Sequence, residues 1–286
     1  MKFVVRVPWD VANDQLMAIL QEIVQTLEKE KPVGSELLGA GLSFLGNINQ
    51  INKELLFSSR WRNIRNFSFK TLEERLNMEV LVYTSLEAQL EYLMINKPDL
   101  TDGGTLLYHW GYGVGASFAS NGNILRSKLG CIMEIGHTTY NPNSTVECIC
   151  GKVGCLETEC ALWAILDKIP YSRAQIPEDE EKFSTFFIES ELKTLDVIKT
   201  ATQVAASGMS TLYQILFPKT ILVESPFLTE ESQKKVFTRH FYDNTPEYTS
   251  QNVEIKFLEP GFRGEIYGCT YELVKNRLRM ELIAKS

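Results

Sequence analysis

The stretch from Met133 to Glu157 concentrates side chains that could bind a metal ion. It contains His137 and three of the six cysteines of the chain, Cys148, Cys150 and Cys155. Three thiolates and one imidazole match the closed tetrahedral coordination of a structural Zn²⁺ site. Soft sulfur ligands also favour Zn²⁺ over Mg²⁺ and Ca²⁺. We therefore predict a zinc site with these four ligands.

The spacing of the last two cysteines supports a shared ion. Gly151 and Gly154 lie between Cys150 and Cys155 and allow the backbone to turn tightly, so that both thiols can face one metal. The alternative is a set of buried small residues beside one surface histidine, because buried cysteines are common in proteins. The other cysteines are spread out and are expected in the core: Cys131, Cys160 and Cys269.

The composition is that of an ordinary globular protein. The chain has 286 residues, of which 44% are hydrophobic and 23% charged, and this length suffices for two domains. The net charge of -7 argues against a general nucleic-acid-binding surface, which needs clustered Lys and Arg.

The sequence predicts neither a membrane span nor a signal peptide. No apolar run approaches the length of a membrane span, and residues 1–16 lack the apolar core and the cleavage site of a signal peptide. We therefore expect a cytoplasmic protein without a membrane span. Thiols stay reduced in that compartment, so clustered cysteines indicate a metal more often than a disulfide.

Hydrophobic periodicity predicts strands that alternate with helices. The predicted helices are 14–29, 69–77, 86–95, 159–168, 195–216, 230–241 and 265–279. The predicted strands are 2–7, 36–44, 80–84, 105–110, 115–120, 220–223 and 253–257. Residues 46–53 are interpreted as a polar turn, and residues 168–182 as a surface loop. The alternation predicts an α/β protein with mainly parallel pairing in each half.

Two sequence motifs carry a family resemblance. The run E-I-G-H ends at His137, and C-x-C-G-x-x-G-C-L-E-T begins at Cys148. Together they resemble the signature of the ROK family, which groups repressors, open reading frames and sugar kinases. The residues of these two motifs look most like those of the repressor branch, the regulators of N-acetylglucosamine and glucose utilisation. Ten residues separate His137 from Cys148, one more than we expect in those regulators, and loop 141–145 should absorb the extra residue.

The resemblance extends over most of the chain. It includes residues 37–49, 55–82, 106–125 and 208–227. It implies the two-lobed sugar kinase, actin and Hsp70 architecture, which is a ribonuclease H-like α/β fold. We expect a shortened N-terminal lobe over residues 1–110, completed by the C-terminal helix. The C-terminal lobe would then span residues 111–286 and carry the zinc site.

Several parts of a kinase site are expected to be missing. Alignment with the family kinases puts their catalytic Asn-Asp pair on Thr84 and Ser85, and a serine hydroxyl cannot act as the base near neutral pH. The N-terminal turn that holds phosphates in those kinases is also expected to be absent. The Gly-Gly that approaches adenosine appears as Glu224-Ser225. The glycines of residues 111–115 are interpreted as a structural turn, so we predict no ATP-dependent catalysis.

The resemblance implies sugar contacts at Glu134, His137 and Glu157, with Ser85 at a further contact position. Carboxylates accept short, charge-assisted hydrogen bonds from neighbouring hydroxyls. An imidazole that is oriented by a metal can offer its second nitrogen to another hydroxyl. The alternative is that Glu134 and Glu157 are solvated charges that flank a structural zinc loop.

These observations favour a non-catalytic ROK-type transcriptional regulator, or sugar-sensing effector domain, with a structural zinc ion. Residues 1–33 supply no helix-turn-helix, so we expect no direct DNA binding by this chain alone. The family suggests a homodimer and a sugar effector. Two alternatives remain open. One is an ATP-dependent hexose or N-acetylhexosamine kinase with an unusual active site, and the other is a degenerate scaffold without a ligand.

Overall fold

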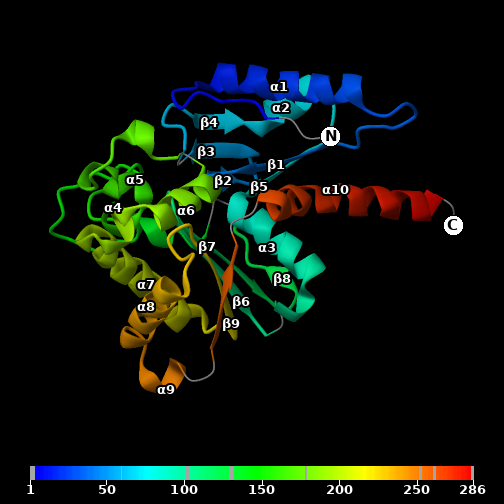
Figure 1. The fold of residues 1–286 in the computed structure, drawn as a ribbon. Helices are drawn as coiled ribbons and strands as arrows, with labels where there is room; N and C mark the ends of the chain where they lie inside the picture. The colour runs from blue at the N-terminus through cyan, green and yellow to red at the C-terminus, as the bar shows by residue number, and fades with distance from the viewer. Residues whose placement is uncertain are drawn as a thin grey trace. The chain divides into compact units, whose positions relative to one another are not determined.

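The computed structural model describes residues 4–58, 60–100, 103–128, 132–177, 179–250, 253–259 and 262–284 (Figure 1). The chain divides into two compact units. The first unit comprises Met1–Tyr92, Arg126–Cys131 and Arg263–Ser286, and the second comprises Leu93–Leu125 and Ile132–Phe262. Each unit has its own hydrophobic core, as expected of a compact folding unit.

The first unit contains two small sheets. Strands β1 (Ala40–Phe44) and β5 (Val80–Thr84) pair in parallel. Strands β2 (Gly46–Asn49), β3 (Glu54–Ser58) and β4 (Arg65–Ser68) form an antiparallel sheet. These sheets share their core with two helices, α1 (Asn13–Glu30) and α2 (Phe69–Leu76). Apolar residues three and four apart on α1 and α2 supply the buried faces.

Helix α10 (Phe262–Ala284) packs closely against β1 and against α3 (Ser85–Asn96). A Cβ atom on Gly268 would lie 1.8 Å from the carbonyl oxygen of Ala88. A Cβ atom on Gly41 would lie 2.3 Å from the carbonyl oxygen of Cys269. Only glycine permits two backbones to approach this closely, so both positions fix how α10 packs within the first unit.

The second unit is built on a mixed five-stranded sheet in the order β10-β9-β6-β7-β8. Its strands are β6 (Thr105–Trp110), β7 (Val114–Ser120), β8 (Asn123–Ile124), β9 (Thr220–Glu224) and β10 (Glu254–Leu258). Strands β6, β9 and β10 run parallel, and β7 and β8 add antiparallel partners at one side. The carboxyl ends of β6 and β9 therefore meet at the same edge of the sheet.

Helices pack around this sheet. The α-helices are α4 (Leu156–Cys160), α5 (Leu162–Ile165), α6 (Glu180–Glu189), α7 (Asp196–Leu216), α8 (Glu231–Asp243) and α9 (Glu247–Ser250). The short 3₁₀ turns are η1 (Pro98–Leu100), η2 (Ile135–His137), η3 (Leu166–Lys168), η4 (Arg173–Gln175) and η5 (Glu191–Thr194). Helix α7 buries a long apolar face that ends at Phe217, which closes the helix in the left-handed conformation with φ of 49°.

Trp110, the last residue of β6, sits at the centre of the second core. Its ring stacks on Phe227 with a centroid distance of 4.5 Å. Its Nε1 atom donates a hydrogen bond of 2.8 Å to the carbonyl oxygen of Cys160. The buried indole thus satisfies its polar atom while filling the core, and it fixes the end of β6 where the hairpin to β7 begins.

The long helices and most of the apolar strands agree with the sequence predictions, but the strand predicted over 36–44 begins only at Ala40, and several short elements differ. Residues 4–8 form no strand, and Val4 and Val5 are exposed. Residues 46–49 form β2 rather than a turn. The helix predicted over 159–168 is broken at Ala161 into α4 and α5, and the loop predicted over 168–182 contains η4 and the start of α6.

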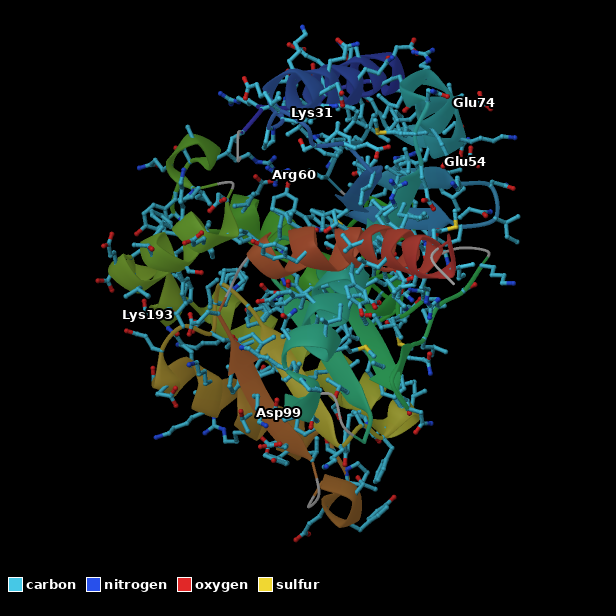
Figure 2. The ribbon with its side chains drawn as sticks, turned by 90° about the vertical axis from the view of Figure 1, so that its right-hand side faces the viewer. Lys31, Glu54, Arg60, Glu74, Asp99 and Lys193 are labelled. Carbon is cyan, nitrogen blue, oxygen red and sulfur yellow. The ribbon has the colours of Figure 1, made fainter. Side chains whose placement is uncertain are left out.

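The sequence predicts mainly parallel strand pairs, but the pairs among β2–β4 and among β6–β8 are antiparallel. The compact units do not divide at the predicted lobe boundary at residue 110: Leu93–Leu125, with β6, belongs to the second unit, and Arg126–Cys131 belongs to the first. Charged side chains such as Glu74 and Asp99 lie at the surface of their units (Figure 2). Among the helices in the described ranges, none is both long and apolar enough to cross a membrane.

Candidate metal centre and sugar site

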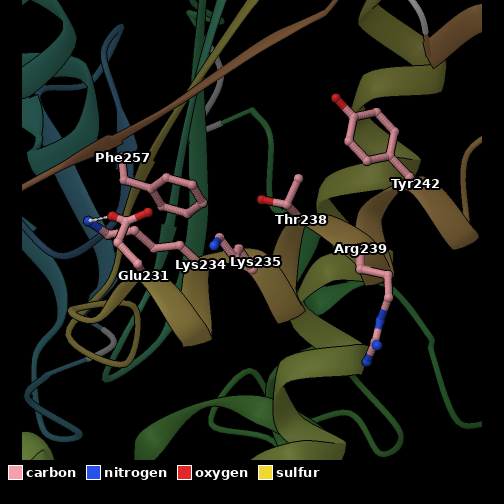
Figure 3. Close-up of a pocket in the computed structure, with 7 residues that line it drawn as sticks. All are labelled: Glu231, Lys234, Lys235, Thr238, Arg239, Tyr242 and Phe257. Carbon is pink, nitrogen blue, oxygen red and sulfur yellow. Dashed lines mark hydrogen bonds and ion pairs between the residues drawn. The ribbon is translucent and has the colours of Figure 1, made fainter.

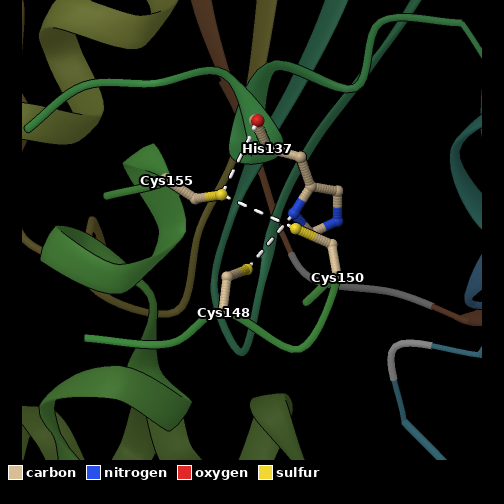
Figure 4. Close-up of side chains that lie close together, drawn as sticks. All are labelled: His137, Cys148, Cys150 and Cys155. Carbon is tan, nitrogen blue, oxygen red and sulfur yellow. Dashed lines mark hydrogen bonds between the residues drawn. The ribbon is translucent and has the colours of Figure 1, made fainter. Parts of the chain in front are cut away.

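The four predicted metal ligands lie together in the second unit. The ligand atoms of His137, Cys148, Cys150 and Cys155 are all within 4.8 Å of one another. The Sγ atom of Cys148 lies 3.4 Å from the Nδ1 atom of His137, and the Sγ atoms of Cys150 and Cys155 are 3.6 Å apart. Figure 4 shows the three sulfur atoms and the imidazole converging on one point. Donors this close and this soft fit a Zn²⁺ ion.

Local backbone hydrogen bonds build the loop that carries the thiols. The N–H group of Cys148 donates to the carbonyl oxygen of Lys152 at 2.7 Å, and the N–H group of Gly151 donates back to Cys148 at 2.9 Å. Gly151 and Gly154 adopt φ of 85° and 72°. A Cβ atom on Gly154 would lie 2.1 Å from the carbonyl oxygen of Asn141, so this turn requires glycine.

The thiols are held away from water. The exposed fractions of Cys148 and Cys155 are 3% and 1%, and Cys150 is half-buried. Burial raises the pKa of the Cys148 and Cys155 thiols, because a thiolate loses its hydration in this environment. A bound divalent cation has the opposite effect on coordinating thiols. Cys160 and Cys269 are buried outside this cluster, and the described cysteines are all free thiols; Cys131 lies outside the described residues.

The two nitrogens of His137 face different groups. His137 is the last residue of turn η2. Its Nδ1 atom points to the cysteines, and its Nε2 atom lies 3.7 Å from the carboxylate of Glu134. The Glu134 side chain is 38% exposed, whereas that of His137 is 15% exposed. The structure therefore brings a solvent-accessible carboxylate next to the outer nitrogen of a predicted metal ligand.

Glu157 is held more tightly than the sequence suggested. Its exposed fraction is 4%, and both carboxylate oxygens accept hydrogen bonds. Oε1 accepts from the N–H group of Val114 at 2.8 Å, and Oε2 accepts from the Nε1 atom of Trp163 at 3.1 Å. The interpretation of Glu157 as a solvated charge is wrong, because this carboxylate is a fixed, buried part of the second unit.

Ser85 belongs to the first unit and is the first residue of α3. The residue before it caps the helix. The N–H group of Thr84 donates to Oε2 of Glu87 at 3.2 Å, and the N–H group of Glu87 donates to the Thr84 hydroxyl at 3.4 Å. This reciprocal pair is a capping box. Thr84 and Ser85, which the family resemblance aligns with the catalytic pair of the kinases, thus begin a capped helix.

A second polar cluster was not predicted from the sequence. His109, at the end of β6, lies with its Nε2 atom 3.3 Å from Oε1 of Glu180, the first residue of α6. Its Nδ1 atom lies 3.9 Å from Oε2 of Glu224, at the end of β9. The local signals are a histidine next to the end of a strand and an acidic run after a proline, but the sequence pattern predicts residues 168–182 as a loop.

An open pocket also lies along α8 and β10, with a volume of about 460 Å³ (Figure 3). Its lining includes Lys234, Lys235 and Arg239. Lys234 pairs with Glu231 at 3.1 Å and lies 5.7 Å from the centre of the Phe257 ring. The pocket lacks the carboxylate–imidazole arrangement found at the metal cluster, so we assign the candidate site to the cluster.

The family model described as "ROK family" matches residues 6–250. The chain belongs to the ROK family. A glucokinase of Halalkalibacterium halodurans is 36% identical over 127 residues, which cover 43% of this chain and 38% of the relative. A xylose repressor of Caldicellulosiruptor bescii is 27% identical over 166 residues, which cover 55% of this chain and 40% of the relative. The chain thus spans less than half the length of these two curated relatives.

Solved structures agree on the fold. A ROK family transcriptional regulator, a homologue of the Escherichia coli MLC protein, superposes with a TM-score of 0.74 at 18% identity, covering 93% of this chain and 69% of the regulator. A ROK hexokinase from Thermus thermophilus superposes with a TM-score of 0.71 at 20% identity, covering 96% of this chain and 91% of the hexokinase. These matches confirm the predicted actin-like sugar kinase fold. The relatives of this chain include both repressors and sugar kinases.

Proposed function

We propose that this chain is a non-catalytic, sugar-sensing domain of the ROK regulator type, with a structural zinc ion. The observation that carries the proposal is the orientation of His137. Its Nδ1 atom faces the three thiols and its Nε2 atom faces Glu134. A metal on the inner nitrogen would fix the ring, and the outer nitrogen could then contact a ligand hydroxyl.

His137, Cys148, Cys150 and Cys155 would hold the zinc ion. When bound, the ion would cross-link the loop and would compensate the negative charge of the thiolates. The chain's own contribution is the loop geometry, because the Cys148–Lys152 hydrogen bond and the Gly154 turn already bring the donors together.

Sugar recognition would rest on Glu134, His137 and Glu157, which all belong to the second unit. Glu134 is accessible and can accept hydrogen bonds from neighbouring hydroxyls. Glu157 keeps both oxygens in fixed positions through Val114 and Trp163. A carboxylate that is already oriented loses little conformational entropy when it binds a ligand.

The absence of catalysis is proposed from the helix cap at Thr84. In a phosphoryl-transfer site, a carboxylate must accept the proton of the attacking hydroxyl. Here the nearest carboxylate in sequence, Glu87, accepts from the Thr84 N–H group and serves the cap. The Ser85 hydroxyl cannot take its place as a base.

The rival function is an ATP-dependent hexose or N-acetylhexosamine kinase. The glucokinase relative favours it, since that identity of 36% is higher than the 27% of the xylose repressor. A coupled ADP-release assay with glucose, N-acetylglucosamine and xylose separates the two functions. Hexose-dependent release of ADP above background would refute the non-catalytic proposal.

A third possibility is a scaffold without a ligand, and a thermal-shift screen with the same sugars distinguishes it. A ligand at one hundred times its Kd should add about 2.7 kcal/mol to the free energy of unfolding, whereas a scaffold would show no shift. We also propose a homodimer, which the family resemblance implies. With a net charge of -7, the chain by itself is not expected to bind operator DNA in a salt-titrated gel shift.

A further inference from the structure

The open pocket along α8 and β10 is not used by the proposed function. Its lining comes from one face of α8, where residues three and four positions apart lie side by side, and from the ring of Phe257 on β10. Another face of α8 carries Phe237 and Phe241, which are fully buried in the core. Glu231 and Tyr242, at the two ends of the lining, lie about 16 Å apart along the helix axis. The pocket is therefore an elongated surface feature on a well-packed scaffold.

The lining of this pocket is positively charged, although the net charge of the chain is -7. It contains three cations, Lys234, Lys235 and Arg239, and one acid, Glu231. The Glu231 side chain is 77% exposed, so water screens its ion pair with Lys234. Within the described ranges, no residue forms a hydrogen bond or an ion pair with the side chain of Lys235 or Arg239. Both of these charges are therefore available to a ligand.

The ring of Phe257 holds a third charge of the pocket in place. The Nζ atom of Lys234 lies 5.7 Å from the centre of this ring, and the Lys234 side chain is only 19% exposed. The face of an aromatic ring attracts an ammonium group. Figure 3 shows Lys234 beneath the Phe257 ring and Lys235 beside it, farther along α8. A ligand that meets an already ordered charge loses less conformational entropy on binding.

Strand β10 adds backbone groups to this surface, because it is the terminal strand in the sheet order. The N–H group of Glu254 donates to the carbonyl oxygen of Lys219 at 2.9 Å, toward β9. Since parallel pairing uses alternate residues, the N–H and C=O groups of Ile255 and Phe257 point away from β9. No residue in the part of the chain that the structure describes bonds these groups. The edge of β10 therefore offers both donors and acceptors.

We propose that this surface docks an acidic, extended segment of a partner protein, which adds to β10 as a further strand. In strand addition, main-chain hydrogen bonds at a sheet edge give affinity and alternate side chains give specificity. Every second side chain of the added strand would lie on the face of the sheet that α8 covers. Carboxylates at those positions would pair with Lys235 and Arg239.

The backbone edge favours a peptide over a nucleic acid. A phosphate backbone could pair with the cations of α8, but it offers no donor to the carbonyl groups of Ile255 and Phe257. A peptide strand supplies donors and acceptors in alternation, as the edge of β10 does. The inference goes beyond the sugar-sensing function and does not depend on it.

The full chain can be tested with a short fluorescein-labelled peptide in which glutamate and threonine alternate. We expect saturable binding in fluorescence anisotropy that weakens as NaCl is added, because salt screens exposed charges. Lys235→Glu should weaken this binding at least about tenfold. Lys70→Glu is the matched control, because it makes the same charge change at an exposed residue of the first unit and should not weaken binding. No binding by the natural protein, or equal affinities of the two variants, would overturn the proposal.

Two further measurements distinguish strand addition from a purely electrostatic contact. A peptide N-methylated at alternate amides keeps its charge but loses donors for the edge, so it should bind at least about tenfold more weakly. In the natural protein, the original peptide should slow amide hydrogen exchange at Ile255 and Phe257. Unchanged exchange at these residues, or tight binding of the N-methylated peptide, would contradict strand addition. An oligonucleotide of equal charge that bound more tightly than the peptide would assign the surface to nucleic acids instead.

Discussion

The Nδ1 atom of His137 lies 3.4 Å from the Sγ atom of Cys148. These residues belong to different local structures, a 3₁₀ turn and a loop stabilised by its own hydrogen bonds. The side chains of Cys150 and Cys155 lie in the same cluster, and these four potential metal ligands lead to the first prediction.

Purified protein should contain about one Zn²⁺ per chain by elemental analysis. Cys150→Ser should lose the metal, and because binding energy is also folding energy, its Tm should fall by roughly 5–10 °C. Adding a chelator should lower the Tm of the natural protein and leave that of the variant nearly unchanged. Cys160→Ala is the control, since Cys160 is buried outside the cluster and its variant should retain the metal. A metal-free protein of unchanged stability would contradict the zinc assignment.

The metal cluster could be predicted from the sequence because its residues are close along the chain and their types are unusual together. The long helices α1 and α7 were predictable from their apolar periodicity for the same reason, since the signal is local. Their observed bounds, Asn13–Glu30 and Asp196–Leu216, differ by one residue from the predicted ones.

The polar cluster around His109 could not be predicted from local patterns. It forms because β6 and β9 are parallel neighbours and because α6 begins beside them, although these elements are far apart in the sequence. Strands β2–β4 were missed for a related reason: they are short and only partly buried, so they lack a clear alternation. The role of Glu157 could not be predicted either, since Glu157 lies on α4 and its donor Val114 lies on β7, distant in the sequence.

The helix cap at Thr84 yields a second prediction. Thr84→Ala should destabilise the protein by about 1 kcal/mol, because it removes the hydroxyl that accepts from the Glu87 N–H group. Urea denaturation followed by circular dichroism measures the change. Thr26→Ala is a suitable control, because Thr26 lies inside α1 and bonds only the preceding turn through its hydroxyl among the contacts described. Equal stability of the two variants would argue against a structural role for Thr84.

Replacing Ser85 by Asp tests the same region for catalysis. We expect Ser85→Asp to show no hexose-dependent turnover of ATP, because Glu180 would still occupy the hairpin donor at Tyr112. A coupled ADP-release assay provides the measurement. Turnover gained by this single substitution would show that the rest of a kinase site is intact.

Glu134 offers the sharpest test of sugar recognition. For a sugar that stabilises the natural protein, Glu134→Gln should lower the affinity about ten- to a hundredfold, the loss of a charged hydrogen-bond partner. Glu157→Gln is less clean, because its new amide would meet the N–H donor of Val114 or Trp163 and so disturb the fold. Glu147→Gln, an exposed change in the same loop, should leave the affinity unaltered. Calorimetry that finds Glu134→Gln equal to Glu147→Gln would move the sugar site away from His137.

The pKa of His109 predicts how the stability of the second unit depends on pH. Burial lowers this pKa, but the charges and hydrogen bonds of Glu180 and Glu224 outweigh burial and raise the pKa well above its usual value. In the unfolded chain the pKa of histidine is about 6.5. The stabilisation from the charged imidazole is therefore fully present below about pH 6.5 and is lost as pH rises through the folded-state pKa.

His109→Gln should consequently be less stable than the natural protein near pH 6, and the difference should shrink as the pH is raised above neutrality. Urea denaturation of both proteins at a series of pH values gives the comparison, and taking the difference cancels the titration of the thiols. His240→Gln serves as the matched control, because His240 lies on α8 near Asp243 and away from this cluster. A difference that stays constant or grows with pH would mean that His109 is neutral in the folded protein, and the ionic link between β6, β9 and α6 would have to be abandoned.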